Sequence, residues 1–357
     1  MKVSESFILR RETVPLRIGN VVIGAGAPVS VQSMTKTDTR NVRATLAQIR
    51  RLEKLGCEIV RLAVPDMEAA EALGRIKART RLPLIADIHF DHRLALACLK
   101  RGVDGLRLNP GNIGGRAKIE EVVRAAKSRA VPIRIGVNSG SLEKDLLSRH
   151  GGATSEAMVE SALRHIRILE DLDFRLIKVS LKASDVLRTV EAYRLLAEQT
   201  PYPFHAGITE AGGRLSGAVK SAVGLGLLLG EGLADTIRVS LTASPEEEVR
   251  VAYQILGSLD LRRRGINLVS CPSCGRTETA LIRMAAQIEK SLQGIQTPLT
   301  VAVMGCMVNG PGEAREADIG VACGQGGGVI FKRGRILAKV AESKIVAALI
   351  KEIERMK

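Results

Sequence analysis

Between residues 29 and 241 the chain alternates short apolar-rich runs with longer amphipathic segments. Eight of the short runs have the length and composition of β-strands, and they are Val29–Met34, Glu58–Val64, Leu82–His89, Gly105–Asn109, Ile133–Asn138, Leu176–Lys182, Phe204–Thr209 and Thr236–Leu241. Helical periodicity marks segments between them, at Val42–Leu55, Glu68–Ala78, Ile119–Ser128, Glu156–Leu172 and Asp185–Glu198. Eight strand–helix units predict an α/β protein built on a TIM (β/α)8 barrel. A doubly wound open sheet is the alternative, although it usually has fewer strands.

The hydrophobic pattern changes on both sides of this repeat. Residues 5–26 predict a short hairpin with its turn at Gly19-Asn20. The residues after Arg262 predict a small α+β domain with strands at Ile266–Ser270, Leu299–Met304, Ile319–Ala322 and Gly328–Lys332, a short apolar run at Ile336–Val340, and helices over about Thr277–Leu292 and Glu342–Met356. We therefore expect a barrel over residues 1–262, including the hairpin, and a second domain over residues 263–357.

Polar side chains occupy alternate positions in several of the predicted barrel strands. The set comprises Arg61, Asp87, His89, Arg107, Asn109, Arg134, Asn138, Lys178, Ser180, Lys182, His205, Arg238 and Ser240. Alternate side chains of a strand share one face, and helices cover the outer face of a barrel, so this set points inward. Buried cations need anions, and Asp87 and Glu210 supply only part of the charge. A bound polyanion such as a diphosphate would supply the rest. The alternative is that the cations pair with acids or reach solvent at strand ends.

Two glycine-containing loops follow predicted barrel strands. They are Asn109-Pro110-Gly111-Asn112 and Asn138-Ser139-Gly140-Ser141. The carboxyl ends of barrel strands form the catalytic mouth, where backbone N–H groups of such loops can bind phosphate. Each loop alone is typical of an ordinary turn.

Three cysteines of the second domain have the spacing of a metal site. Cys271 and Cys274 form a CxxC pair, and Cys306 lies in a glycine-rich segment. Bends around such residues expose N–H groups that can bond cluster sulfurs, which favours a [4Fe-4S] cluster. A structural zinc site usually has two ligand pairs, and a thioredoxin-like thiol pair stands alone. With three thiolates one iron needs another ligand, and both Cys323 and Glu313 are candidates.

The remaining two cysteines and the overall charge further restrict the possible functions of the protein. Cys57 and Cys98 lie in apolar segments and are expected to be core residues. The net charge of +15 first suggests nucleic-acid binding, but the cations are scattered, and an aromatic content of 2% leaves few rings for base stacking. An anionic substrate or an acidic protein partner explains the charge. No apolar run is long enough to span a membrane, and no targeting peptide is evident, so we expect a cytoplasmic protein without membrane contact.

The motifs taken together resemble one enzyme family. They are Val-Gln-Ser-Met-Thr, Ala-Asp-Ile-His-Phe, Arg-Leu-Asn-Pro-Gly-Asn, Arg-Ile-Gly-Val-Asn-Ser-Gly-Ser-Leu, Gly-Ile-Thr-Glu-Ala-Gly, Cys-Pro-Ser-Cys-Gly-Arg-Thr and Gly-Cys-Met-Val-Asn-Gly-Pro-Gly-Glu. In this order they resemble the 4-hydroxy-3-methylbut-2-enyl diphosphate synthases of the methylerythritol phosphate pathway of isoprene biosynthesis. The resemblance runs from about residue 10 to 340 and is to the bacterial two-domain form.

The resemblance implies a specific chemistry. The family reduces 2-C-methyl-D-erythritol 2,4-cyclodiphosphate, opening its ring with two electrons and loss of water. It implies one [4Fe-4S] cluster per chain, held by Cys271, Cys274, Cys306 and Glu313. It also implies flavodoxin or ferredoxin as electron donor, and a homodimer in which the cluster domain of one subunit closes over the barrel mouth of the other.

The resemblance also implies roles for the inward-facing side chains. Phosphates and hydroxyls would be bound by Arg61, Arg107, Asn109, Arg134, Asn138, Lys178, Lys182, Arg238 and Ser240. Asp87, His89 and Glu210 would line the reacting end, with Glu210 as a proton donor or hydroxyl-orienting group. The alternatives are an iron–sulfur reductase of another phosphorylated small molecule and a zinc-stabilised nucleic-acid binder. The metal content of the purified protein distinguishes the two alternatives, because the first would contain iron and sulfide and the second zinc.

Overall fold

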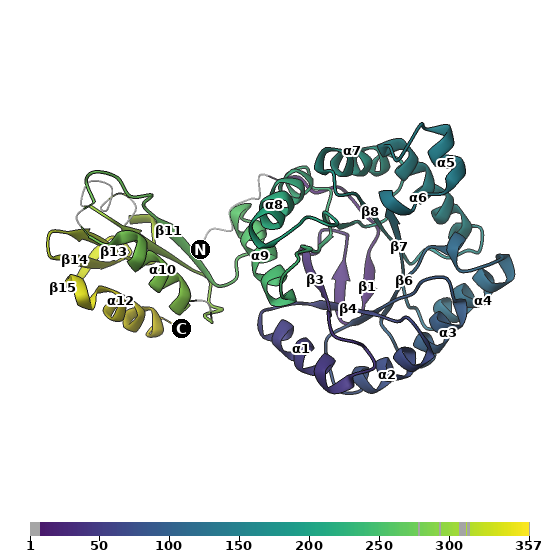
Figure 1. Ribbon diagram of the computed structural model, residues 1–357, viewed down its shortest axis with the longest axis horizontal. Helices are drawn as coiled ribbons and strands as arrows, with labels where there is room; N and C mark the ends of the chain where they lie inside the picture. The colour runs from purple at the N-terminus through teal and green to yellow at the C-terminus, as the bar shows by residue number, and fades with distance from the viewer. Residues whose placement is uncertain (1–7, 278, 293, 307–311, 313–314, 357) are drawn as a thin grey trace. The chain divides into compact units, whose positions relative to one another are not determined.

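The computed structural model describes residues 8–277, 279–292, 294–306, 312 and 315–356. The chain forms two compact units, Met1–Arg262 and Arg263–Lys357, and each has its own hydrophobic core (Figure 1). None of the helices in the described ranges is long and apolar enough to cross a lipid bilayer.

The first unit is a closed parallel barrel. Its strands are β3 (Ser30–Met34), β4 (Ile59–Ala63), β5 (Leu84–Asp87), β6 (Gly105–Arg107), β7 (Ile133–Asn138), β8 (Ile177–Lys182), β9 (His205–Ala206) and β10 (Thr236–Ile237). Neighbours in the order β8-β7-β6-β5-β4-β3-β10-β9 are hydrogen-bonded, and a parallel bridge between Val179 and Phe204 joins the two ends. The predicted TIM barrel is confirmed, and the open-sheet alternative is wrong.

Helices surround the barrel (Figure 1), and they are α1 (Val42–Lys54), α2 (Met67–Lys77), α3 (His92–Lys100), α4 (Arg116–Lys127), α5 (Lys144–Arg149), α6 (Ser155–Glu170), α7 (Val186–Ala197), α8 (Arg214–Gly230) and α9 (Pro245–Ser258). Several begin at a side chain that accepts a backbone N–H, as Asp66, Asp91 and Asp185 do. Such caps satisfy N–H groups that have no partner within the helix. The apolar faces of these helices pack on the outward-facing Val, Ile and Leu of the strands.

A short hairpin closes the amino-terminal end of the barrel. Strands β1 (Leu16–Ile18) and β2 (Val21–Ile23) are antiparallel, and Gly19 in the turn between them has a φ of 56°. The hairpin is shorter than the expected 5–26, because residues 8–15 form no strand. The buried side chains of the hairpin pack on Ile59 and Ile85 at the start of two barrel strands. This apolar layer covers one end, so a ligand must enter at the other, carboxyl-terminal end.

The second unit is a five-stranded mixed sheet with its main core on one face. Its strands are β11 (Ile266–Ser270), β12 (Leu299–Met304), β13 (Ile319–Gly324), β14 (Gly327–Lys332) and β15 (Arg335–Ala341), in that order across the sheet. Helices α10 (Leu281–Leu292) and α12 (Ile345–Glu354) pack on it. Helix α10 begins later than predicted because residues 274–277 form a turn, in which the Thr277 N–H donates to the Cys274 carbonyl.

Candidate functional site

A band of charged side chains crosses the barrel interior above the apolar layer. The register places Asp87 beside Arg107, Arg107 beside Arg134, and Arg134 beside Lys178 on four consecutive strands. All four residues are buried. Period-two alternation on the strands therefore gives the interior charge that the sequence predicts.

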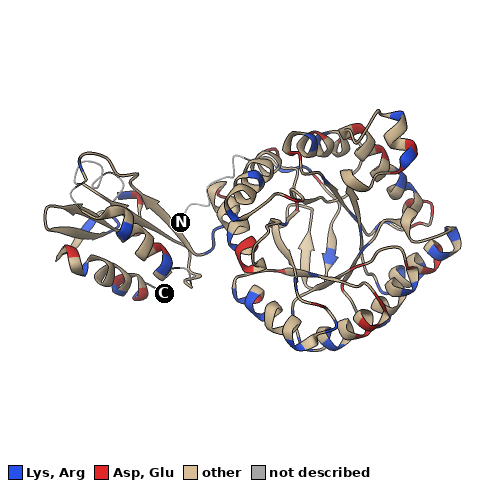
Figure 2. Cartoon of the chain, viewed as in Figure 1, with Lys and Arg blue, Asp and Glu red and all other residues tan. Residues whose placement is uncertain are grey.

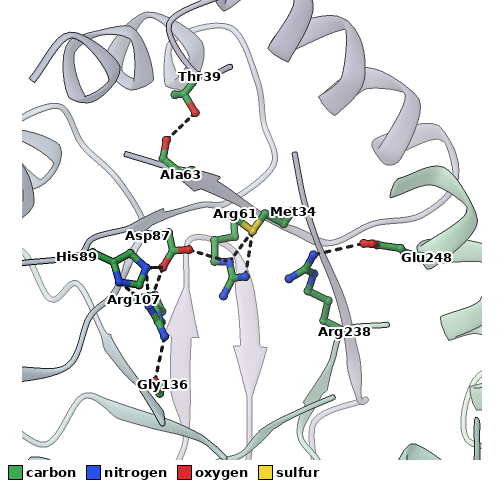
Figure 3. Close-up of polar contacts among 10 residues, drawn as sticks. All are labelled: Met34, Thr39, Arg61, Ala63, Asp87, His89, Arg107, Gly136, Arg238 and Glu248. Carbon is green, nitrogen blue, oxygen red and sulfur yellow. Dashed lines mark hydrogen bonds and ion pairs between the residues drawn. The ribbon is translucent and has the colours of Figure 1, made fainter. Parts of the chain in front are cut away.

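Asp87 is the acidic centre of this band. Its Oδ1 lies 3.3 Å from Arg107 Nη1, and its Oδ2 lies 3.6 Å from Arg61 Nε (Figure 3). Burial alone would raise the pKa of Asp87, but Arg61, Arg107 and Arg134 together hold it below its usual range. Arg61 also donates to the sulfur of Met34 at 3.0 Å. Asp87 is therefore an ionised anchor that orients two guanidinium groups.

His89 stands at the outer edge of the same cluster. Its Nε2 lies 2.8 Å from Arg107 Nη1 and 3.6 Å from Asp87 Oδ1 (Figure 3). Burial, with the neighbouring Arg107 and Arg61, lowers the pKa of His89 although Asp87 opposes the shift. The imidazole is therefore neutral at pH 7 and can accept a hydrogen bond from Arg107.

A second interior carboxylate, Glu248, was missed by the sequence reasoning. In the sequence it belongs to Ser244-Pro245-Glu246-Glu247-Glu248, a typical helix start. In the structure it is 2% exposed, and its Oε1 accepts the Leu241 N–H at 3.1 Å and lies 3.1 Å from Lys36 Nζ. Its Oε2 lies 3.7 Å from Arg238 Nη2 (Figure 3). No periodic signal distinguishes Glu248 from the two acids before it.

Several interior cations keep nitrogens without a protein partner. Among the described residues, Arg134 Nε and Nη1, Lys178 Nζ, Arg107 Nε and Arg238 Nε are buried and donate to no acceptor. Burial, followed by the nearby guanidinium groups, lowers the pKa of Lys178 and Lys182 well below the usual value, and lowers the pKa of Arg238 to about 10. Unpaired buried donors of one sign cost free energy unless an anion joins them. The interior is therefore suited to a polyanion.

Gly136 on β7 and Gly207, directly after β9, make room for these long side chains. A Cβ at Gly136 would lie 2.6 Å from Arg107 Nε, and one at Gly207 would lie 3.0 Å from Lys182 Nζ. The Gly136 backbone is also recognised by Asn109, whose amide donates to its carbonyl at 3.1 Å and accepts from its N–H at 2.8 Å. Asn109 therefore continues the pairing of β6 with β7 and fixes the start of the following loop.

The mouth of the barrel carries the remaining predicted residues. Asn138 and Lys182 end neighbouring strands and pair in register. Glu210 and Ser240 line a small cavity of about 160 Å³ that Lys36, Arg238 and Glu248 complete. Glu210 is exposed and has a φ of 51°, a conformation that is unfavourable for a glutamate and typical of functional sites.

The loop after β6 does not offer the backbone donors that the sequence suggests. The Asn112 N–H bonds the Asn109 carbonyl at 2.9 Å, and the Gly111 N–H bonds His165 Nδ1 at 3.2 Å. The expectation that this loop donates N–H groups to phosphate is wrong at these two positions, because both N–H groups already donate to acceptors within the protein.

The three predicted cluster thiols lie at one edge of the second unit. Cys271 follows β11 and Cys306 follows β12, and these strands are parallel neighbours. Cys274 is exposed. It follows Ser273, whose φ of 69° lies in the left-handed region. Within the described ranges no three His, Cys, Asp or Glu side chains are close enough together to hold a metal ion. Glu313 lies outside the described residues. The donor set of three accessible thiols among Gly and Pro suits an iron–sulfur cluster.

The other cysteines are core residues. Cys323, the alternative fourth ligand, is buried between the sheet and α10, with its Sγ 4.0 Å from the sulfur of Met284. Burial raises the pKa of Cys57 and of Cys98 to about 12. Buried thiols with raised pKa values are poor metal ligands. All six cysteines lie in the described part of the chain and are thiols.

Asp87→Asn is expected to destabilise the protein by about 3–5 kcal/mol, because two buried guanidinium groups lose their anion. The folded-state pKa of Asp87 is below the ordinary value of 3.8, so its contribution is complete above about pH 4 and is lost as pH falls through the folded pKa. Thermal unfolding between pH 3 and 8 measures this. Asp91→Asn, at an exposed Asp–Arg pair, is the control, and equal losses in the two variants would contradict the interpretation.

A solved structure of low sequence identity shares the fold of this chain. Dihydropteroate synthase from Stenotrophomonas maltophilia superposes with a TM-score of 0.50 at 15% sequence identity, covering 69% of this chain and 98% of that one. At this identity the likeness shows a TIM barrel and nothing about the reaction.

Comparison with protein families identifies both units. The GcpE TIM-barrel domain matches residues 13–253, and the GcpE protein C-terminal domain matches residues 267–355. Similar proteins are named 4-hydroxy-3-methylbut-2-en-1-yl diphosphate synthase (flavodoxin). One from Geobacter sulfurreducens is 62% identical over 98% of this chain and 99% of its own, and one from Thermodesulfovibrio yellowstonii is 59% identical over 98% and 100%. The chain belongs to the GcpE family.

Proposed function

We propose that this protein reduces 2-C-methyl-D-erythritol 2,4-cyclodiphosphate to 4-hydroxy-3-methylbut-2-enyl diphosphate, the reaction of the synthases that it resembles. The reaction takes up two electrons and two protons and releases one water. The observation that carries the proposal is the closed barrel whose interior holds several buried cations with nitrogens that have no protein partner among the described residues. Residues 1–262 bind the substrate, and residues 263–357 hold the redox group.

The charge balance of the interior supports a diphosphate substrate. Six cations face inward, and among the buried described carboxylates Asp87, Glu248 and Asp235, the last acting on Lys178, oppose them. The cations are Arg61, Arg107, Arg134, Lys178, Lys182 and Arg238. Charge-assisted hydrogen bonds from such groups are about twice as strong as neutral ones, and guanidinium forks match phosphate oxygens. A diphosphate would accept hydrogen bonds from the buried nitrogens that have no protein partner among the described residues.

The register of β8 separates the roles of its two lysines. Lys182 is level with Asn138 at the mouth, whereas Lys178 is level with Arg134, four residues deeper. Four residues of strand span about 13 Å. We therefore assign direct substrate contact at the mouth to Lys182, with Asn138, Arg238 and Ser240. Lys178 and Arg134 lie deeper, and we assign to them the long-range electrostatic attraction of the substrate. Arg61, Arg107 and Asn109 complete the set.

The reacting end is assigned to Glu210, His89 and Asp87. Glu210 is exposed at the mouth and can donate a proton to, or orient, a departing hydroxyl. Neutral His89 accepts from Arg107, and ionised Asp87 fixes Arg107 and Arg61, so both hold the guanidinium groups in place. Proton transfer and orientation are thus supplied by side chains of the barrel.

The redox group is assigned to the second unit. We assign Cys271, Cys274, Cys306 and Glu313 as ligands of one [4Fe-4S] cluster per chain. When bound, the cluster supplies electrons one at a time and a Lewis-acidic iron. The buried position of Cys323 supports Glu313 as the fourth ligand.

An acidic electron carrier fits the surface charge. The names of the relatives specify flavodoxin, and we propose flavodoxin, or ferredoxin, as the donor for this chain. Lys and Arg occur on helices all round the barrel and on the second unit in the view of Figure 2, in keeping with a net charge of +15. Opposite charges accelerate encounter and make it salt-dependent.

The decisive experiment is turnover by anaerobically purified protein. With reduced flavodoxin and the cyclic diphosphate, we expect formation of the linear diphosphate, and about four irons and four sulfides per chain. Iron and sulfide without turnover of this substrate would favour an iron–sulfur reductase of another phosphorylated molecule. A single zinc per chain would overturn both. Glu313→Ala should reduce turnover strongly, and unchanged turnover would reject the oxygen ligand.

We further propose that the protein is a homodimer, and helix α8 supports this. Its Leu215, Val219, Val223 and Leu227 recur every four residues and are 38–79% exposed. Lys220 is the sole charged side chain between Leu215 and Gly230 in the sequence. An exposed apolar ridge at this spacing suits packing against another helix.

Val219→Glu is expected to shift the protein from dimer to monomer, because it places a charge in the centre of this ridge. Sedimentation equilibrium measures the shift. Lys220→Glu, which introduces the same side chain at the adjacent exposed position, is the control and should remain dimeric. A Val219→Glu protein that stays fully dimeric would reject α8 as the interface, and a monomeric wild-type protein would reject the homodimer.

A further inference from the structure

His165 connects two loops at the barrel mouth. It lies on α6, outside the strands, and is 3% exposed. Its Nδ1 accepts the Gly111 N–H at 3.2 Å, within the turn η1 (Pro110–Asn112) that follows β6. Its Nε2 lies 3.4 Å from Oε1 of Glu143, just after the turn η2 (Ser139–Ser141) that follows β7. One imidazole therefore contacts both loops.

The contacts determine the tautomer of this ring. Because Nδ1 accepts a hydrogen bond, the proton of the neutral ring is on Nε2 and points to the Glu143 carboxylate. The interaction with His165, together with a hydrogen bond from Ser161 Oγ at 3.2 Å, lowers the pKa of Glu143 to about 2 despite partial burial. Glu143 is thus a permanent anion that orients the imidazole. The ring cannot turn over without losing both bonds.

The loop after β6 packs closely against the His165 ring at Gly111. A Cβ at Gly111 would lie 2.8 Å from His165 Cε1, so only glycine allows the loop to rest on the ring. The same loop begins at Asn109, which is bonded to the Gly136 backbone of β7. The loop after β7 begins at Asn138 and ends at Glu143. The histidine therefore lies between the segments that start with two of the assigned substrate ligands.

We propose that His165 is a positioning residue that sets the spacing of Asn109 and Asn138 at the mouth and so controls the affinity for the diphosphate. This inference rests on the proposed function. The residue lies on α6, outside the barrel strands, and it acts through the Gly111 N–H and the Glu143 carboxylate. It is expected to influence substrate binding much more than the chemical step.

Three substitutions in the anaerobic holoenzyme separate the two contacts. His165→Phe keeps the ring shape and loses both; His165→Asn keeps an acceptor near the Nδ1 position; His165→Gln keeps a donor near the Nε2 position. We expect His165→Phe to raise KM for the cyclic diphosphate, and the inhibition constant of inorganic diphosphate, by about 10- to 100-fold. We expect kcat to change by less than about threefold, and the Asn and Gln variants to give intermediate values.

Controls distinguish positioning from general damage to the fold. His150→Phe also removes a histidine–carboxylate contact to α6, at Glu160, but touches neither loop, and it should leave both constants unchanged. If His165→Phe lowers the unfolding temperature yet leaves KM and the inhibition constant within about twofold, the residue is only structural and the proposal is wrong. If the wild-type protein neither binds inorganic diphosphate nor turns over the substrate, the proposed function fails, and the inference fails with it.

Discussion

Cys271→Ala is expected to abolish turnover of the cyclic diphosphate and to remove the visible absorption, iron and sulfide of the cluster. Loss of groups around a metal ligand typically costs about 10- to 100-fold, so loss of the ligand itself should cost about 1,000-fold or more. The barrel is a separate compact unit, and inorganic diphosphate should still bind to it with unchanged affinity. Iron and sulfide analysis, turnover and calorimetric binding measure the three quantities.

Cys323→Ala is the matched control for this prediction. Cys323 is fully buried beside Met284, so its removal leaves a small cavity and lowers stability while the cluster is retained. If Cys323→Ala lost the iron and Cys271→Ala kept it, the assignment of ligands would be reversed. The control also tests whether the fourth ligand is an oxygen, because a four-thiolate cluster would need Cys323.

Arg134→Met is expected to weaken diphosphate binding and at the same time to stabilise the substrate-free protein. Arg134 is 3% exposed, and its Nε and Nη1 have no partner among the described residues. Burial, with the nearby Arg61 and Arg107, lowers its pKa well below the usual value. Replacing a poorly compensated buried charge by an apolar side chain of similar length often stabilises a protein, by about 1–4 kcal/mol.

The opposite effect is expected on the ligand. Removing a buried positive charge weakens the long-range attraction that the barrel interior exerts on a polyanion, so the affinity for inorganic diphosphate and for the substrate should fall by about 10- to 100-fold. Thermal unfolding with and without diphosphate measures both effects in one experiment, and cluster content should not change. Arg129→Met, at an exposed arginine, should do neither. A destabilised Arg134→Met protein with normal affinity would show that Arg134 is structural.

The barrel could be predicted because the sequence pattern that specifies each strand or helix lies within that element. Each strand such as Ile133–Asn138 carries its period-two pattern within a few residues, and each helix carries its own apolar face. The predicted and observed strands coincide closely in the longer cases. The last two barrel strands are shorter than predicted, at His205–Ala206 and Thr236–Ile237, because regular pairing ends where the mouth loops begin.

The charged interior was predictable for the strand residues and not for their partners. Arg107 and Lys182 lie on strands, where alternation fixes the face to which they point. Glu248 lies on a helix and Lys36 on a loop. Glu248 contacts both Lys36 and Arg238, and the three residues come together only when the barrel closes. His165 gave no signal at all, since a lone histidine on an amphipathic helix resembles any buried polar residue.

The sequence by itself determined the kind of protein: an eight-strand barrel with inward cations, a second domain with three cysteines, and motifs that resemble one family. These properties follow from periodicity and spacing along the chain, which are local. Only the tertiary structure decided which charges remain unpaired, which loop N–H groups are already used, and that Cys323 is core. Each of these depends on contacts between residues far apart in sequence, such as Glu248 with Ser33 or His165 with Gly111. Pairing and burial are properties of the packed chain, and no spacing rule encodes them.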